Sequence, residues 1–175
     1  MANHRLLGGG LVSVALAALA LAGGTGALAA KPDKGPFEAE PLVLPAGLAC
    51  EFDVQFSPEP GSNFSQKEFS DGRFVVTGSG QDRVTNLENG HSIVLHTSGQ
   101  TAFKPLSESE TRIELSGHNI VYLFPGDEGP FGTVDEPGAL YFFKGRVSEI
   151  LDLEANVITS FESSGHGTEL CSLLS

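Results

Sequence analysis

Short β-forming runs separated by turn-forming residues fill the chain after residue 48, and they constrain its fold more than any other feature. Apolar and polar residues alternate over residues 50–56, which is the period-two pattern of a half-buried strand. An Asn-Gly pair at residues 89–90 separates two β-rich runs, 83–87 and 92–96, and this dipeptide is typical of a hairpin turn because both residues tolerate positive φ. These signals predict antiparallel strands joined by short turns.

The remaining runs extend the same pattern to the end of the chain. Further strands are expected at 73–77, 101–104, 111–115, 120–124, 139–147, 149–153 and 156–161. Ser116–Asn119 is predicted to be a second hairpin turn, and Glu154–Asn156 a tight turn. The best helix candidate is Thr168–Leu174, with Thr168 as its N-cap. Eight to ten short antiparallel strands and a short C-terminal helix predict an all-β domain, either a sandwich or a closed barrel.

Residues 1–29 have the pattern of a secretory signal peptide. Arg5 gives a positive start, an apolar run covers residues 11–22, and small residues at 27 and 29 predict cleavage before Ala30. A retained membrane anchor is the alternative, but glycines interrupt the apolar stretch, which favours cleavage. We therefore expect a secreted, extracellular protein with no stable membrane anchor after cleavage. Residues 30–47 hold four prolines and predict an extended lead-in outside the core, followed by one all-β domain over 48–175.

Export also predicts how the two cysteines are used. Secreted proteins reach an oxidising compartment, where a disulfide is stable. A bond between Cys50 and Cys171 would join the start of the folded part to its end and close a loop of 121 residues. If both thiols are paired, neither is left to act as a nucleophile.

The charge balance excludes one class of partner and disfavours another. The chain has 10 Lys and Arg residues against 22 Asp and Glu residues, a net charge of −12 with histidine neutral. Nucleic-acid binding needs a basic surface, so no nucleic-acid partner is expected. A polybasic membrane-surface role is disfavoured for the same reason.

Five segments in the second half of the chain form a recognisable set: Val84–Ser92, Ser98–Gln100, Phe124–Asp127, Phe142–Val147 and Leu170-Cys171. On these residues, the chain resembles a group of small exported all-β proteins, of unassigned activity, from high-GC Gram-positive bacteria. The resemblance implies a bacterial source, export and an all-β fold, and it brings no catalytic residues.

No catalytic motif stands out in the sequence. There is no Gly-x-Ser-x-Gly elbow. His91, His96, His118 and His166 are isolated from one another and lack metal-ligand spacing, so we interpret them mainly as surface and turn residues. The aromatic run Tyr141-Phe142-Phe143 is expected to pack in the core, with Phe142 on the face opposite the other two. A sugar-stacking platform is the alternative, but with no Trp and 2 Tyr in the chain carbohydrate binding is disfavoured.

The acidic segment 125–138 is the strongest candidate for a functional loop. It is long and rich in Gly and Pro, and such loops on β scaffolds often carry binding. We favour a solvated acidic connector, with a weak calcium site at Asp127, Glu128, Asp135 and Glu136 as the alternative. Phe131 at its centre is expected either to plug the core or to form an exposed contact. No other cofactor is expected.

The sequence thus favours a secreted, non-catalytic binding or interaction domain with a partner in the cell envelope or another protein. Two alternatives remain open. One is a small-ligand carrier, if the strands close into a barrel around a cavity. The other is a hydrolase that uses carboxylates such as Glu51, Asp53, Asp127 or Asp135 as general acid and base.

Overall fold

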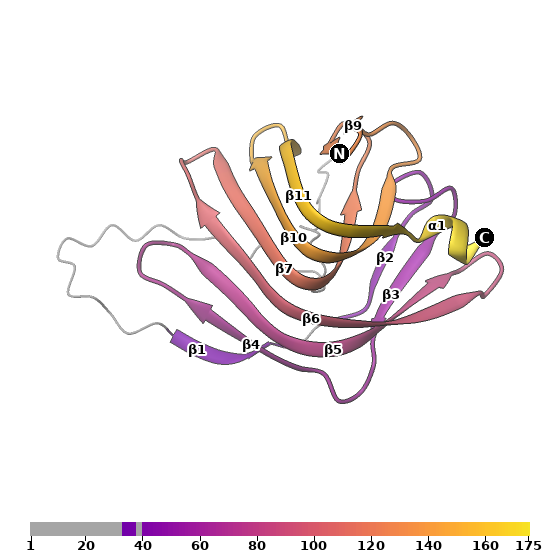
Figure 1. Cartoon of the computed structure of the whole chain (residues 1–175), viewed down its shortest axis with the longest axis horizontal. Coiled ribbons are helices and arrows are strands. Elements are labelled where there is room, and N and C mark those ends of the chain that lie inside the picture. Colours follow the sequence, from indigo (N-terminus) through magenta and orange to yellow (C-terminus); the bar gives the residue numbers. More distant parts are fainter. Residues whose placement is uncertain (1–32, 38–39) are drawn as a thin grey trace.

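A single curled antiparallel sheet of nine strands forms the body of the protein (Figure 1). The computed structural model describes residues 33–37 and 40–175, and the expected signal peptide lies outside this part. The sheet strands are β1 (Asp33–Phe37), β2 (Leu42–Leu44), β3 (Val54–Pro58), β4 (Asn63–Glu68), β5 (Phe74–Asn86), β6 (Ser92–Pro105), β7 (Glu110–Leu123), β10 (Ala139–Asp152) and β11 (Val157–Glu169). A small separate hairpin, β8 (Glu128–Gly129) with β9 (Gly132–Thr133), and a terminal turn of helix, α1 (Cys171–Leu174), complete the chain.

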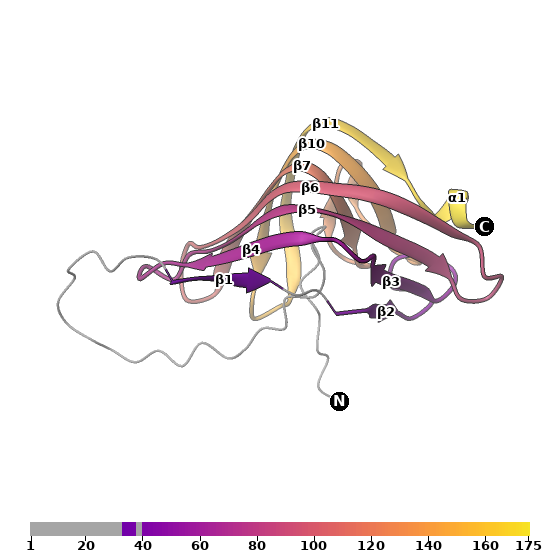
Figure 2. The same ribbon diagram turned by 90° about the horizontal axis from the view of Figure 1, so that it is seen from below.

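The strands follow one another across the sheet in the order β1-β4-β5-β6-β7-β10-β11, while β3 pairs with the second half of β5 and β2 pairs with β3 (Figure 2). Because β1 and β11 end this path, the sheet is a half-barrel with two open edges. The all-β antiparallel class and the short C-terminal helix are confirmed.

A row of glycines bends five long strands at the same level. Gly78, Gly99, Gly117, Gly145 and Gly165 are register partners across β5, β6, β7, β10 and β11, and all have positive φ. A Cβ at Gly99 would overlap the carbonyl oxygen of Ser116, and one at Gly117 would overlap that of Ser98. Only glycine permits this backbone and this closeness of strands. The glycine row therefore creates the crease along which the strands fold in Figure 1.

The crease lets the concave face of the sheet fold onto itself. The ring centroids of Phe143 and Phe161 lie 6.3 Å apart, although Phe161 pairs with Glu149, six residues from Phe143 along β10. Six extended residues would span about 20 Å. An apolar cluster, which we call the cup core, fills the space inside this folded face. It consists of Phe103, Ile113, Leu115, Val121, Leu123, Phe143, Val147, Leu151 and Ile158.

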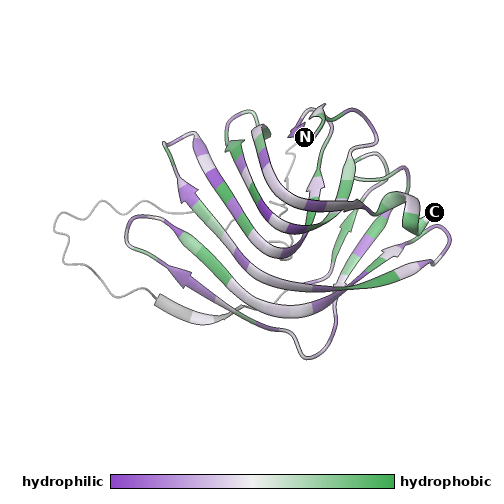
Figure 3. Ribbon diagram, in the orientation of Figure 1, coloured by the Kyte–Doolittle hydropathy of each residue, from purple (hydrophilic) through white to green (hydrophobic). Residues whose placement is uncertain are grey.

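A second apolar cluster fills the wedge where the sheet splits. Pairing between β6 and β7 stops at Ser98 and His118, and the two strands diverge beyond it. The wedge core between them consists of Leu42, Leu44, Ala49, Cys50, Phe52, Val54, Phe56, Val84, Ile120, Tyr122, Phe124, Leu140, Phe142, Leu170 and Leu174. Residues 120–124 are all buried because this part of β7 separates the two cores. Figure 3 shows polar and apolar residues alternating along β7 and β10.

Several local predictions are confirmed. The Asn-Gly segment does turn β5 into β6, with positive φ at Gly90. Residues 154–156 turn β10 into β11, and Asp152 Oδ1 accepts hydrogen bonds from the backbone N–H groups of Glu154 and Ala155. Phe142 lies in the wedge core and Phe143 in the cup core, as the alternation requires.

Other local predictions are wrong, and the glycines explain most of them. Ser116–Asn119 is not a hairpin turn but the bend inside β7, and the runs expected as pairs of short strands are single strands of 13 or 14 residues. The strand expected over residues 50–56 is β3, which begins at Val54 rather than Cys50. Thr168 is not an N-cap, because β11 runs to Glu169 and the helix starts at Cys171.

The expected lead-in contributes to the sheet and the core. Within residues 30–47, β1 pairs with β4, and β2 pairs with β3. Leu42 and Leu44 are buried in the wedge core because β2 extends the sheet at its edge.

Candidate functional site

A shallow polar groove of about 560 Å³ lies beside the glycine row, over strands β6, β7, β10 and β11. Seven of its lining residues present polar side chains from neighbouring positions on one face of the sheet. Arg146 sits opposite Ser116 on one side and Ser164 on the other, and Ser148 sits opposite Glu114 and Glu162. The lining residues are Gln100, Glu114, Leu115, Ser116, Arg146, Val147, Ser148, Glu162, Ser163 and Ser164. Guanidinium donors, carboxylate acceptors and hydroxyls that do both therefore face one space.

The charged groups of the groove differ in how they are paired. At the groove's edge, Glu114 Oε2 forms an ion pair with Lys104 Nζ at a distance of 2.5 Å. Arg146 is exposed and makes no ion pair with a carboxylate of the described chain. By contrast, Arg73 and Arg83 pair with Asp71 and Glu59. Arg146 is thus a cation whose hydrogen-bonding groups face solvent.

A basic row crosses the sheet on the other side of the glycine row. His118 on β7, Lys144 on β10 and His166 on β11 are direct cross-strand partners. The His118 ring also lies 6.4 Å from that of His96, and Lys144 Nζ lies 5.6 Å from the centre of the Phe142 ring. The expectation of surface histidines holds for His91, His96 and His166, which are exposed, but only His91 lies in a turn, between β5 and β6.

A sequence signal for this row did exist. Ser-Gly-His occurs twice, at 116–118 and 164–166, and Lys-Gly-Arg occupies 144–146 between them along the chain. Once the glycines are aligned across the antiparallel strands, the histidines and Lys144 fall opposite one another. The alignment depends on strand register, which the spacing of the motifs did not provide.

The acidic segment 125–138 has a structural role, because the carboxylate of Asp127 is buried and links two strands. Asp127 is 2% exposed, its Oδ2 accepts a 2.7 Å hydrogen bond from Phe124 N, and its Oδ1 accepts one of 2.9 Å from Ile158 N. It thereby ties the end of β7 to the start of β11. The interpretation as a solvated connector is wrong for Asp127, because its backbone partners lie inside the protein.

The four carboxylates proposed for calcium do not gather around one point. Glu128 accepts a 2.7 Å hydrogen bond from Thr133 Oγ1 across the small hairpin, while Asp135 and Glu136 are exposed. Within the described part of the chain, no three His, Cys, Asp or Glu side chains form a group able to hold a metal ion. Phe131 is 91% exposed at the hairpin tip, so it does not plug the core.

Two other carboxyl groups are buried, and both have raised pKa values. Glu149 is 1% exposed in the concave face, where burial and then the nearby Asp127 charge raise its pKa to about 8. Its Oε1 accepts no hydrogen bond from the described residues. Burial likewise raises the pKa of Asp82, which is offset in part by a 2.6 Å hydrogen bond from Thr97 Oγ1.

These carboxyl groups do not make an accessible acid–base pair. Glu149 and Asp127 are almost wholly excluded from solvent, and neither lines the groove. Glu51 and Asp53 are exposed, and Asp53 Oδ1 accepts a 2.7 Å hydrogen bond from Ala46 N. The concave face is likewise filled by the cup core rather than hollow.

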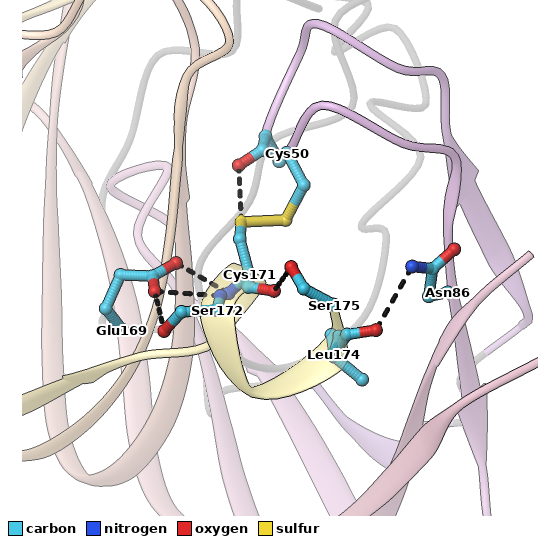
Figure 4. Close-up of a disulfide and its surroundings, with 8 residues drawn as sticks. Cys50, Asn86, Glu169, Cys171, Ser172, Leu174 and Ser175 are labelled. Atoms are coloured by element: carbon cyan, nitrogen blue, oxygen red, sulfur yellow. Dashed lines mark hydrogen bonds between the residues drawn. A yellow bond between two sulfur atoms is a disulfide. The ribbon is translucent and has the colours of Figure 1, made fainter. Parts of the chain in front are cut away.

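The predicted disulfide is present and closes the wedge core (Figure 4). The Cα atoms of Cys50 and Cys171 lie 5.6 Å apart. The Glu169 carboxylate accepts hydrogen bonds from the backbone N–H groups of Cys171 and Ser172, which begin α1. Asn86 Nδ2 and Asn89 Nδ2 each donate a 3.1 Å hydrogen bond to the carbonyl oxygen of Leu174.

The covalent link fits an extracellular protein. Among the helices of residues 33–37 and 40–175, none has the length and apolar character needed to cross a bilayer. Comparisons of the chain with protein-family models, curated proteins and solved structures give no match.

Proposed function

We propose that this chain is an exported, non-catalytic binding domain whose ligand is a short polyhydroxylated molecule, such as an oligosaccharide. The observation that carries the proposal is the polar groove, where Arg146, Glu114, Glu162 and several serines face one space beside the crease. Its volume lies within the range of ordinary ligand sites.

The chemistry of the groove matches neighbouring hydroxyl groups. A sugar hydroxyl both donates and accepts hydrogen bonds, so it can donate to Glu114 or Glu162 and accept from Arg146. The serines at 116, 148 and 164 serve either role. These residues sit on paired strands rather than on loops, so little order has to be gained on binding.

Export is the second part of the proposal. The signal-peptide pattern of residues 1–29 and the Cys50–Cys171 disulfide support it. A ligand outside the cell, in the envelope or the medium, is consistent with that location.

The proposal is tested by NMR titration of the domain with xylotriose, cellotriose, chitotriose and glucuronosyl-xylobiose. We expect saturable shifts of backbone amides around the groove on β6, β7, β10 and β11 for at least one of these ligands. Ser148→Trp, which fills the groove, should weaken that binding at least tenfold. The control Ser70→Trp, at an exposed position between β4 and β5, neither of which lines the groove, should leave it unchanged. Absence of saturable shifts with the whole panel, or equal binding to the S148W variant, would overturn the proposal.

A further inference from the structure

Two cations flank the glycine row on the face that carries the groove, although the chain as a whole has a net charge of −12. Lys144 and Arg146 stand on either side of Gly145, so both point to the same face of β10. Arg146 lines the groove, and Lys144 lies one cross-strand row beyond its edge. A local site of positive charge therefore stands out from an acidic background.

Neither cation is neutralised by the protein. Arg73, Arg83 and Lys104 make ion pairs of 2.5–2.7 Å, whereas Lys144 and Arg146 pair with no carboxylate in the described part. Both are exposed. Lys144 Nζ lies near the face of the buried Phe142 ring, which holds its ammonium group beside the crease.

The neighbours of Lys144 add hydrogen-bonding groups beside it. His118 and His166 face it directly from the two adjacent strands. The imidazole ring of a neutral histidine still carries one N–H donor. An anion bound beside Lys144 therefore has N–H donors on both neighbouring strands.

The opposite side of the groove limits how much negative charge a ligand can bring. Glu114 and Glu162 flank Ser148 in the next row of polar side chains. Both can accept hydrogen bonds from hydroxyl groups, and Glu162, which unlike Glu114 has no ion-pair partner among the described residues, repels further anionic groups. The ligand that fits both sides has one anionic group near Arg146, with Lys144 one row beyond, and hydroxyls near the two glutamates.

We propose that the groove selects an acidic oligosaccharide with a single carboxylate, as in a chain that carries one uronic acid; this rests on the proposed function. Arg146 binds the carboxylate with its planar guanidinium group, and Lys144 adds a second positive charge across Gly145. A singly charged carboxylate suits the site better than a doubly charged phosphate, because Glu162 lines the same groove and no cation of the described chain pairs with it.

Calorimetric titration with one acidic and one neutral trisaccharide of similar size tests the inference. We expect glucuronosyl-xylobiose to bind at least tenfold more tightly than xylotriose. Arg146→Gln should reduce that preference to about twofold or less, and Lys144→Gln should reduce it by a smaller factor. Arg112→Gln removes the same charge at a β7 position outside the groove lining, so it should leave the preference unchanged.

The possible failures are distinguishable. Equal binding of the two trisaccharides would overturn the acidic-ligand inference and leave the glycan-binding function standing. A preference that persists in R146Q, or that R112Q abolishes equally, would also overturn it, since long-range charge would then suffice. Tighter binding of glucose 6-phosphate than of glucuronosyl-xylobiose would overturn the choice of carboxylate. Absence of binding by every sugar would remove the proposed function itself.

Discussion

The wedge core and the cup core belong to one sheet, yet the protein closes them with different chemistry. The wedge core is sealed by the Cys50–Cys171 disulfide and by α1, which packs Leu174 into it. The cup core is sealed by a loop whose buried Asp127 bonds two strand ends, beside the buried Glu149. One closure is a covalent bond that depends on redox state, and the other lies beside Glu149, whose pKa burial raises, so the two ends of the molecule should respond to different conditions.

The prediction with the largest expected effect concerns the disulfide that closes the wedge core. Replacing both cysteines by serine removes a loop closure of 121 residues, which is worth about 4–5 kcal/mol in the chain-entropy model. Urea unfolding of the double variant should show that loss. Hydrogen exchange should show the amides of Leu170 and Val54 losing protection before that of Leu123 in the cup core. Equal loss at both cores would contradict the idea of separate closures.

The second prediction concerns the crease that divides the two cores. Gly117→Ala places a Cβ against the carbonyl oxygen of Ser98 at a φ of +100°, so we expect destabilisation of about 3 kcal/mol. Gly35→Ala is the control, because open space surrounds Gly35 and its φ is not positive. That substitution should stabilise slightly or change nothing. Thermal unfolding measures both, and a tolerated G117A would mean that the bend does not require glycine.

The third prediction concerns the cup core and the pH dependence of stability that Glu149 causes there. The pKa of Glu149 is raised from 4.5 to about 8 in the folded state, so the folded protein keeps a proton that the unfolded chain releases. Stability from this group is complete below pH 4.5 and is lost as the pH rises to about 8, at about 1.4 kcal/mol per pH unit. From pH 5 to 7 the change is about 2–3 kcal/mol.

Denaturant titrations of the wild type and Glu149→Gln at several pH values between 5 and 8 measure this slope. The variant should lose the contribution of Glu149 and keep that of Asp82, whose pKa burial raises in the same direction. Asp82→Asn is the matched control and should retain the larger part of the slope. An unchanged slope in E149Q would show that Glu149 does not titrate as its burial requires.

The parts of the fold that the sequence predicted depend on local chemistry. The Asn-Gly turn, the turn before Asn156 and the opposite burial of Phe142 and Phe143 all follow from residues close together in the chain. The disulfide was predicted from the expected export and from the presence of two cysteines. Each of these features needs no knowledge of which strands are neighbours.

The parts that were missed depend on strand register. Ser116–Asn119 has the composition of a turn, and only the alignment of Gly117 with Gly99 and Gly145 identifies it as a bend within a long strand. The same alignment forms the groove and the basic row. The burial of Asp127 depends on Ile158, which is 31 residues away, so its acidic sequence context gave the opposite expectation.

The position of the disulfide has a mechanical consequence. Tension applied to the segments before Cys50 and after Cys171 passes through the sulfur–sulfur bond and bypasses the chain between them, a sequence separation of 121. Fully extended, that stretch would add roughly 400 Å of length at about 3.4 Å per residue. β1 and β2 precede Cys50 and pair with β4 and β3, so pulling on the chain ends first separates these two edge pairings. After that, while the bond is intact, the rest of the β3–β11 region carries none of the load, and the proposed ligand site keeps its shape.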